Sequence, residues 1–105
     1  TSDTRLENGV TKAGLRGHTK DQLFYTIDVP ANCRALLVTT SGGSGDADLV
    51  VIFGSKPTCD SYGCQSALYN NNERCDIYNV QSGVYHVMVL AYTEFNNVKL
   101  TGVYM

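Results

Sequence analysis

The sequence predicts an all-β domain, and three observations support this fold class. β-Branched and aromatic residues alternate with polar residues over several short segments, which is the period of a half-buried strand. Glycines recur between these segments, and the apolar spacing typical of helices is close to absent. Because 105 residues suit one hydrophobic core, we expect residues 1–105 to form a single domain.

The first clear strand is expected at residues 22–29. Side chains on alternate positions of a strand share one face, and the positions that would form the inner face are Leu23, Tyr25, Ile27 and Val29. Pro30 follows directly and has no N–H to donate to a neighbouring strand. The segment therefore predicts a half-buried strand that ends at the proline.

Residues 35–39 and 48–53 are two nearly continuous apolar segments, and they predict central strands that are covered on both sides or packed where two sheets meet. Residues 41–48, between them, combine glycines with aspartates. Glycines tolerate a positive φ, and aspartates hydrogen-bond their own backbone in turns. This composition predicts a tight turn, and we expect the two strands to form a hairpin around it.

A second hairpin is expected at the C-terminus. Residues 83–92 form an apolar segment, residues 93–97 interrupt it, and residues 98–104 resume an alternating pattern. The last segment would place Val98, Leu100 and Tyr104 on one face and Lys99 and Thr101 on the other. This alternation is typical of a sheet with one solvated face.

Four cysteines in a short chain predict disulfides: Cys33, Cys59, Cys64 and Cys75. They are even in number and lack a nearby histidine that would suggest zinc, and such bonds persist only outside the reducing cytosol. A Cys64–Cys75 bond would close the irregular segment 54–79 and stabilise the fold by about 3 kcal/mol. The hairpin around residues 41–48 would then favour Cys33–Cys59, although four cysteines formally permit three connectivities.

Charge and hydropathy exclude several functions. The net charge is −2 and the eight Lys and Arg residues are dispersed, so we expect no nucleic-acid partner. The longest apolar run, near residues 49–53, is shorter than the roughly 20 residues of a membrane helix. We expect no membrane partner and a monomer. Because the N-terminus lacks a signal-peptide segment, we expect any targeting sequence to be removed or to lie on a longer precursor.

Catalytic motifs are not apparent. His18 lies in a polar, glycine-containing stretch and His86 lies within a strand pattern, and neither accompanies a nucleophile-elbow motif. A catalytic thiol would need an unpaired cysteine. We therefore expect the chain not to be an enzyme, with no catalytic residue.

Asp46 and Asp48 are candidate metal ligands. Carboxylates one residue apart in a flexible turn can supply hard oxygen ligands to calcium. The competing interpretation is that both aspartates cap the turn through Asx hydrogen bonds. Calcium is the one cofactor that the sequence suggests.

The chain contains seven tyrosines and no tryptophan, so the candidate aromatic binding residues are tyrosines. Tyrosine combines a flat apolar face with a hydroxyl, so exposed copies suit docking onto extended protein chains. Tyr62, Tyr69 and Tyr92 lie beside segments rich in Asn, Ser and Gly, and we expect them to bind substrate. Tyr25 and Tyr85 alternate with apolar neighbours and are expected in the interior.

Several segments, taken in order, resemble one family. Residues 6–10, 14–17 and 24–30 are similar to the opening of the bacterial pre-peptidase C-terminal domain. Residues 41–51 resemble its Gly-Asp-Ala-Asp-Leu signature, and residues 83–88 its closing strand. Cys64 and Cys75 resemble its cysteine pair, whereas Cys33 and Cys59 are additions to the family pattern. Val50 also departs from it, because an aromatic residue often stands there.

The resemblance implies a jelly-roll-like antiparallel β-sandwich, here stapled by two disulfides, and a secreted, extracellular location. It also implies a non-catalytic C-terminal accessory domain of a secreted bacterial protease. Such a domain is similar to the collagen-binding modules of collagenases, so its implied partners are an extracellular protein substrate, such as collagen, and the parent catalytic domain. The alternative is a secretion or processing element that is cleaved off or autoinhibits the protease during maturation.

Overall fold

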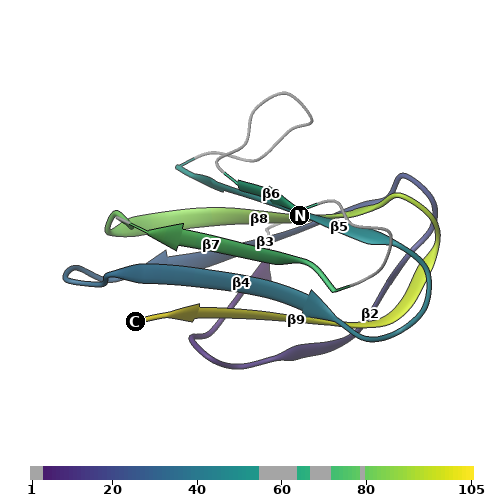
Figure 1. Cartoon of the computed structure of the whole chain (residues 1–105), viewed down its shortest axis with the longest axis horizontal. Helices are drawn as coiled ribbons and strands as arrows, with labels where there is room; N and C mark the ends of the chain where they lie inside the picture. Colours follow the sequence, from purple (N-terminus) through teal and green to yellow (C-terminus); the bar gives the residue numbers. More distant parts are fainter. Residues whose placement is uncertain (1–3, 55–63, 67–71, 79) are drawn as a thin grey trace.

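The computed structural model describes residues 4–54, 64–66, 72–78 and 80–105, with the backbone alone at residues 64–66. These residues form two β-sheets and contain no helix (Figure 1), so the predicted all-β class is confirmed. The strands are β1 (Thr4–Arg5), β2 (Lys12–Gly17), β3 (Gln22–Val29), β4 (Ala35–Ser41), β5 (Ala47–Phe53), β6 (Cys64–Ser66), β7 (Arg74–Tyr78), β8 (Gly83–Ala91) and β9 (Phe95–Tyr104).

The strand order is β1-β3-β8-β5-β6 in the five-stranded sheet and β2-β9-β4-β7 in the four-stranded sheet. Strand β1 runs parallel to β3, and the other pairings are antiparallel. Apart from β5 and β6, strands that follow one another in the sequence lie in different sheets. The chain therefore passes back and forth between the two layers (Figure 1).

Both predicted hairpins are wrong. Strand β4 pairs with β7 and β9, whereas β5 pairs with β6 and β8 in the other sheet. Likewise β8 and β9 belong to different sheets. When consecutive strands lie in different sheets, their apolar faces approach the shared core from opposite sides. Two strands of a hairpin in one sheet approach it from the same side.

The core lies between the two sheets. Tyr25 and Tyr85 are 7% and 4% exposed, which confirms their predicted interior positions. The largest buried apolar side chains of the core cluster come from five strands: Ile27, Leu36, Val38, Leu49, Val51, Val87, Val89, Phe95, Val98 and Leu100. Burial of each such side chain contributes about 1.5–3 kcal/mol, so this cluster is the main source of stability.

Strand β9 begins earlier than predicted. Phe95, which the sequence placed in a polar interruption, is fully buried at the start of β9. An added Cβ on Gly17 would lie 3.1 Å from a ring carbon of Phe95. The phenyl ring thus packs directly on Gly17, which ends β2. Gly17 and Phe95 are also paired in the four-stranded sheet, so β9 begins at this contact.

The cysteines differ in part from the prediction. Cys75 is fully buried in β7 and disulfide-bonded, whereas Cys33 is half-buried and has a free thiol. The predicted Cys33–Cys59 bond is therefore absent from the structure, because its basis was a β4–β5 hairpin that does not form. Cys59 and the side chain of Cys64 lie outside the described residues, so the Cys64–Cys75 bond stays a prediction.

Candidate functional site

A cluster of three buried carboxylates lies where β5 begins. Asp46 and Asp48 are 9% and 8% exposed, and Glu73, just before β7, is 1% exposed. One carboxylate oxygen from each residue lies within 4.8 Å of the other two. The sequence prediction named the two aspartates and missed Glu73, because it lies in a distant polar run and no local pattern links it to them. We call these three residues the carboxylate cluster.

The turn that presents Asp46 is fixed by backbone contacts. Ser44 and Asn96 exchange backbone hydrogen bonds of 3.0 and 3.1 Å. The carbonyl oxygen of Asp46 accepts hydrogen bonds from the N–H groups of Tyr92 and Thr93, at 3.0 and 3.2 Å. The side-chain oxygen Oδ1 of Asp46, in contrast, is buried and has no hydrogen-bond partner among the described residues. This oxygen therefore does not cap the turn.

The backbone around Glu73 is held by Thr40, a buried residue near the end of β4. The Glu73 N–H donates to the carbonyl oxygen and to Oγ1 of Thr40, each at 3.2 Å. The Thr40 N–H donates in return to the Glu73 carbonyl at 2.9 Å. The cluster therefore joins three segments: the turn between β4 and β5, β5 itself, and the segment that enters β7.

Three negative charges in this buried cluster would repel one another. Burial, followed by the negative charges of Asp46 and Glu73 and a hydrogen bond with Asp46, raises the pKa of Asp48 to about 7. Like charges buried close together are stable only when a proton or a cation compensates them. The cluster therefore has the chemistry of a cation or proton site.

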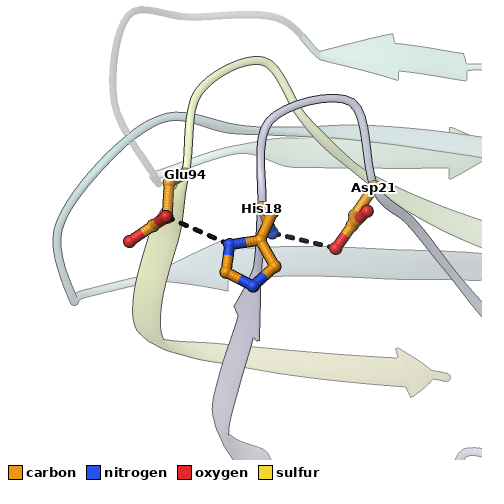
Figure 2. A network of polar contacts seen from close by, with 3 residues as sticks. All are labelled: His18, Asp21 and Glu94. Carbon is orange, nitrogen blue, oxygen red and sulfur yellow. Dashed lines mark hydrogen bonds and ion pairs between the residues drawn. The ribbon is translucent and has the colours of Figure 1, made fainter.

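A second feature joins the connection between β2 and β3 to the connection between β8 and β9 (Figure 2). His18 Nδ1 lies 3.1 Å from Glu94 Oε1, and the His18 backbone N–H donates to Asp21 Oδ2 at 2.9 Å. The adjoining cavity of about 320 Å³ is lined by Arg16, Gly17, His18, Asp21, Glu94 and Asn96. Among these described lining residues there is no hydroxyl or thiol, and the cavity offers charged and amide side chains for polar contacts.

The tyrosines divide between buried and exposed positions. Tyr92, a predicted binding residue, is 63% exposed and lies in the connection that also contains Glu94. Tyr62 and Tyr69, the other two, lie outside the described residues. Tyr78 was not predicted, yet it is 71% exposed. Its exposure could have been inferred from the sequence, because Tyr78 alternates with Arg74 and Asp76. The side chains of these two residues form an exposed ion pair on β7.

Two facing, mainly antiparallel sheets define a β-sandwich. In such domains binding residues commonly lie in the connections between strands. Residues 21–91 match the model of the family described as "Bacterial pre-peptidase C-terminal domain". The chain belongs to this family, which confirms the resemblance seen in the sequence.

Curated relatives are proteases of different kinds. The chain is 42% identical over 100 residues to alkaline serine exoprotease A of Vibrio alginolyticus, covering 95% of this chain and 18% of that protein. It is 42% identical over 95 residues to a zinc metalloprotease of Helicobacter pylori, covering 90% and 37%. It is 48% identical over 99 residues to an extracellular protease of Xanthomonas campestris pv. campestris, covering 94% and 17%. The chain thus spans well under half of each relative.

Solved structures give the same result. The "Solution structure of vEP C-ter 100" has a TM-score of 0.76 and 38% identity, covering 93% of this chain and 96% of that one. The pre-peptidase C-terminal domain of a collagenase from Bacillus anthracis has a TM-score of 0.74 and 15% identity, covering 96% and 94%. The second likeness concerns the fold alone.

The relatives are secreted or extracellular proteases. The predicted secreted, extracellular location is therefore confirmed. Among the described residues, no helix has the length and hydropathy needed to cross a membrane.

Proposed function

We propose that this chain is a non-catalytic accessory module that holds a secreted bacterial protease on insoluble protein substrate such as collagen. One observation carries the proposal. The same domain, at 42% identity in each case, accompanies a relative named a serine exoprotease and another named a zinc metalloprotease. A module that serves two different catalytic chemistries acts on something that both enzymes need, and protein substrate is common to both.

The surface best suited to this role is the loop end, which we define as Arg16, His18, Tyr92, Glu94 and Asn96. Tyr92 offers an exposed aromatic face, and the adjoining cavity offers side chains of both charges together with an amide. Tyrosine and arginine are enriched in protein interfaces, and amide and charged groups can pair with the backbone of an extended chain. The collagenase relationship of one fold neighbour makes collagen the first substrate to test.

The test is co-sedimentation of the 105-residue chain with fibrous collagen. Tyr92→Ala should weaken binding about tenfold, as expected for a central aromatic contact. Tyr78→Ala is the matched control, because the exposed fraction of Tyr78 is similar to that of Tyr92. Tyr78 pairs with Ala35 at the start of β4, whereas the Tyr92 backbone N–H bonds to the turn that follows the end of β4. Equal loss in both variants, or no binding of the parent chain to any insoluble protein, would refute the proposal.

The alternative function is a processing element that assists secretion or autoinhibits the protease and is then removed. Its support is that the domain forms only a small part of each longer relative, so an appended regulatory segment is compatible with the alignment. Deletion of this segment from the parent precursor separates the two functions. Normal yield of active protease outside the cell would contradict the processing role and leave substrate binding in place.

We also infer that Cys64 is the disulfide partner of Cys75. Cys33 is a free thiol, which leaves Cys59 and Cys64 as the remaining cysteines. Strands β6 and β7 contact one another, and Cys64 begins β6 while Cys75 lies in β7. The bond would tie the edge strand of one sheet to the edge strand of the other.

A further inference from the structure

We propose that Asp46, Asp48 and Glu73 form a binding site for one calcium ion, which links the two sheets of the sandwich. The site is separate from the substrate surface proposed above, and it concerns how the domain is stabilised outside the cell. Its residues come from the turn between β4 and β5, from β5, and from the segment that enters β7.

The first observation is the convergence of three carboxylates. Their closest ligand oxygens all lie within 4.8 Å of one another. Calcium binds oxygen at about 2.3–2.6 Å, so two ligands on opposite sides of one ion are about 4.6–5.2 Å apart. Because 4.8 Å is the upper limit on all three separations between the carboxylate oxygens, each pair lies within the span that one calcium ion can bridge. The donors are all hard carboxylate oxygens, which excludes a preference for soft metals.

The second observation is independent of the clustering. Asp46 Oδ1 is buried and has no hydrogen-bond partner within the part of the chain that the structure describes, and the residue as a whole is only 9% exposed. A buried carboxylate oxygen without a partner is costly, because it loses its hydration and gains nothing in return. A bound cation supplies the missing contact and also neutralises the neighbouring carboxylates.

The backbone around the cluster is already in place for binding. Thr40 holds the main chain of Glu73, and the N–H groups of Tyr92 and Thr93 hold the carbonyl of Asp46. These contacts set the three segments without using the free oxygen of Asp46. Ion binding therefore requires little rearrangement, and it adds a direct link between β5 in one sheet and the entry to β7 in the other.

The experiment uses the 105-residue chain after removal of divalent ions with EDTA. Titration with Ca²⁺, followed by calorimetry and thermal unfolding, should give one bound ion per chain and a higher Tm. Mg²⁺ should give a smaller shift, because it requires shorter bonds and stricter octahedral geometry. Absence of any Ca²⁺-dependent shift at millimolar ion, or an equal shift with Mg²⁺, would overturn the calcium assignment.

Asp46→Asn is the main variant, because it keeps the size of the side chain and removes the charge. Its Ca²⁺ affinity should fall at least tenfold. Asp28→Asn is the control, since the Asp28 carboxylate is 48% exposed and pairs with Arg5, away from the cluster. Asp28→Asn should retain the parent response, and an equal Ca²⁺ response in Asp46→Asn would overturn the proposal.

A measurement on the unmodified chain covers the case in which Asp46→Asn does not fold. Hydrogen exchange should slow on Ca²⁺ addition at the backbone amides of Glu73, Tyr92 and Thr93, which surround the cluster. The amides of Asp28 and Thr26 in β3 should respond less. Uniform slowing across the chain, or slowing confined to other segments, would place the ion elsewhere and contradict the site.

Discussion

Ser44 and Asn96 pair through two backbone hydrogen bonds of 3.0 and 3.1 Å, which join the turn after β4 to the start of β9. This isolated bridge holds together two connections that lie far apart in the sequence. Both the carboxylate cluster and the loop end depend on this bridge, because Asp46 follows Ser44 in the sequence and Glu94 precedes Asn96.

Gly45→Ala should destabilise the domain by more than about 3 kcal/mol. Gly45 has a φ of +90°, and an added Cβ would lie 2.0 Å from the carbonyl oxygen of Glu94. The clash is with backbone, so it cannot be relieved by a side-chain rotation. Urea unfolding measures the loss.

Gly14→Ala is the matched control for this effect. Gly14 also has a positive φ, +71°, but nothing lies within 4 Å of an added Cβ. This variant should lose only about 1–2 kcal/mol, the cost of the left-handed backbone conformation. Similar losses for Gly14→Ala and Gly45→Ala would show that the turn between β4 and β5 is not in close contact with the connection between β8 and β9.

The stability of the ion-free chain should depend on the protonation of Asp48. Burial, together with the charges of Asp46 and Glu73, raises the pKa of this carboxyl from 3.8 to about 7. Between these values the unfolded chain has released the proton that the folded chain retains, so this group lowers stability as pH rises. Asp48→Asn removes that dependence. In EDTA, the variant should therefore gain stability relative to the parent between about pH 4 and about pH 7.

Urea unfolding of both proteins across this range provides the measurement. A constant difference between Asp48→Asn and the parent would contradict the raised pKa. With saturating Ca²⁺ at neutral pH the order should reverse, because the parent then gains the binding free energy of the ion.

Cys64→Ala should lower stability by about 3 kcal/mol, the value expected for opening a short disulfide ring. Cys33→Ala should cost less than about 1 kcal/mol, because Cys33 is half-buried and the change removes one sulfur. Peptide mapping without reduction should identify a Cys64–Cys75 link. A link between Cys59 and Cys75 instead would refute the pairing.

His18→Ala should leave stability within about 0.5 kcal/mol of the parent. The His18 side chain is 87% exposed, and its polar contact with Glu94 is also exposed, so this contact contributes little to folding. Binding to collagen should nevertheless fall, because His18 belongs to the loop end. Thermal unfolding and co-sedimentation on the same sample separate the two effects, and unchanged binding would exclude His18 from the surface.

Five strands, β3, β4, β5, β8 and β9, could be predicted from the sequence, but their partners could not. The alternation of residues 22–29 identified β3 correctly, since the period depends only on neighbours along the chain. The glycine-rich segment 41–48 predicted a turn but not its destination. A hairpin and a crossing to the opposite sheet use similar residues, and the choice depends on non-local pairing of β4 with β9.

The candidate site followed the same division. Asp46 and Asp48 could be predicted because two carboxylates in one turn are visible locally. Glu73 could not, because its approach depends on the backbone pairing between Thr40 and Glu73. Tyr78 was missed for a simpler reason: the alternation of β7 with two charged residues indicated an exposed face, but that segment was assigned to an irregular loop.

We propose that this domain contributes binding, and no catalytic step, to a secreted protease. The most direct measurement compares the parent protease with a form that lacks this domain, on a short soluble peptide and on fibrous collagen. We expect equal kcat/KM on the peptide and a strongly reduced rate on the fibres when the domain is absent. Equal rates on fibres, or loss of activity on the soluble peptide with a catalytic domain that remains folded, would contradict it.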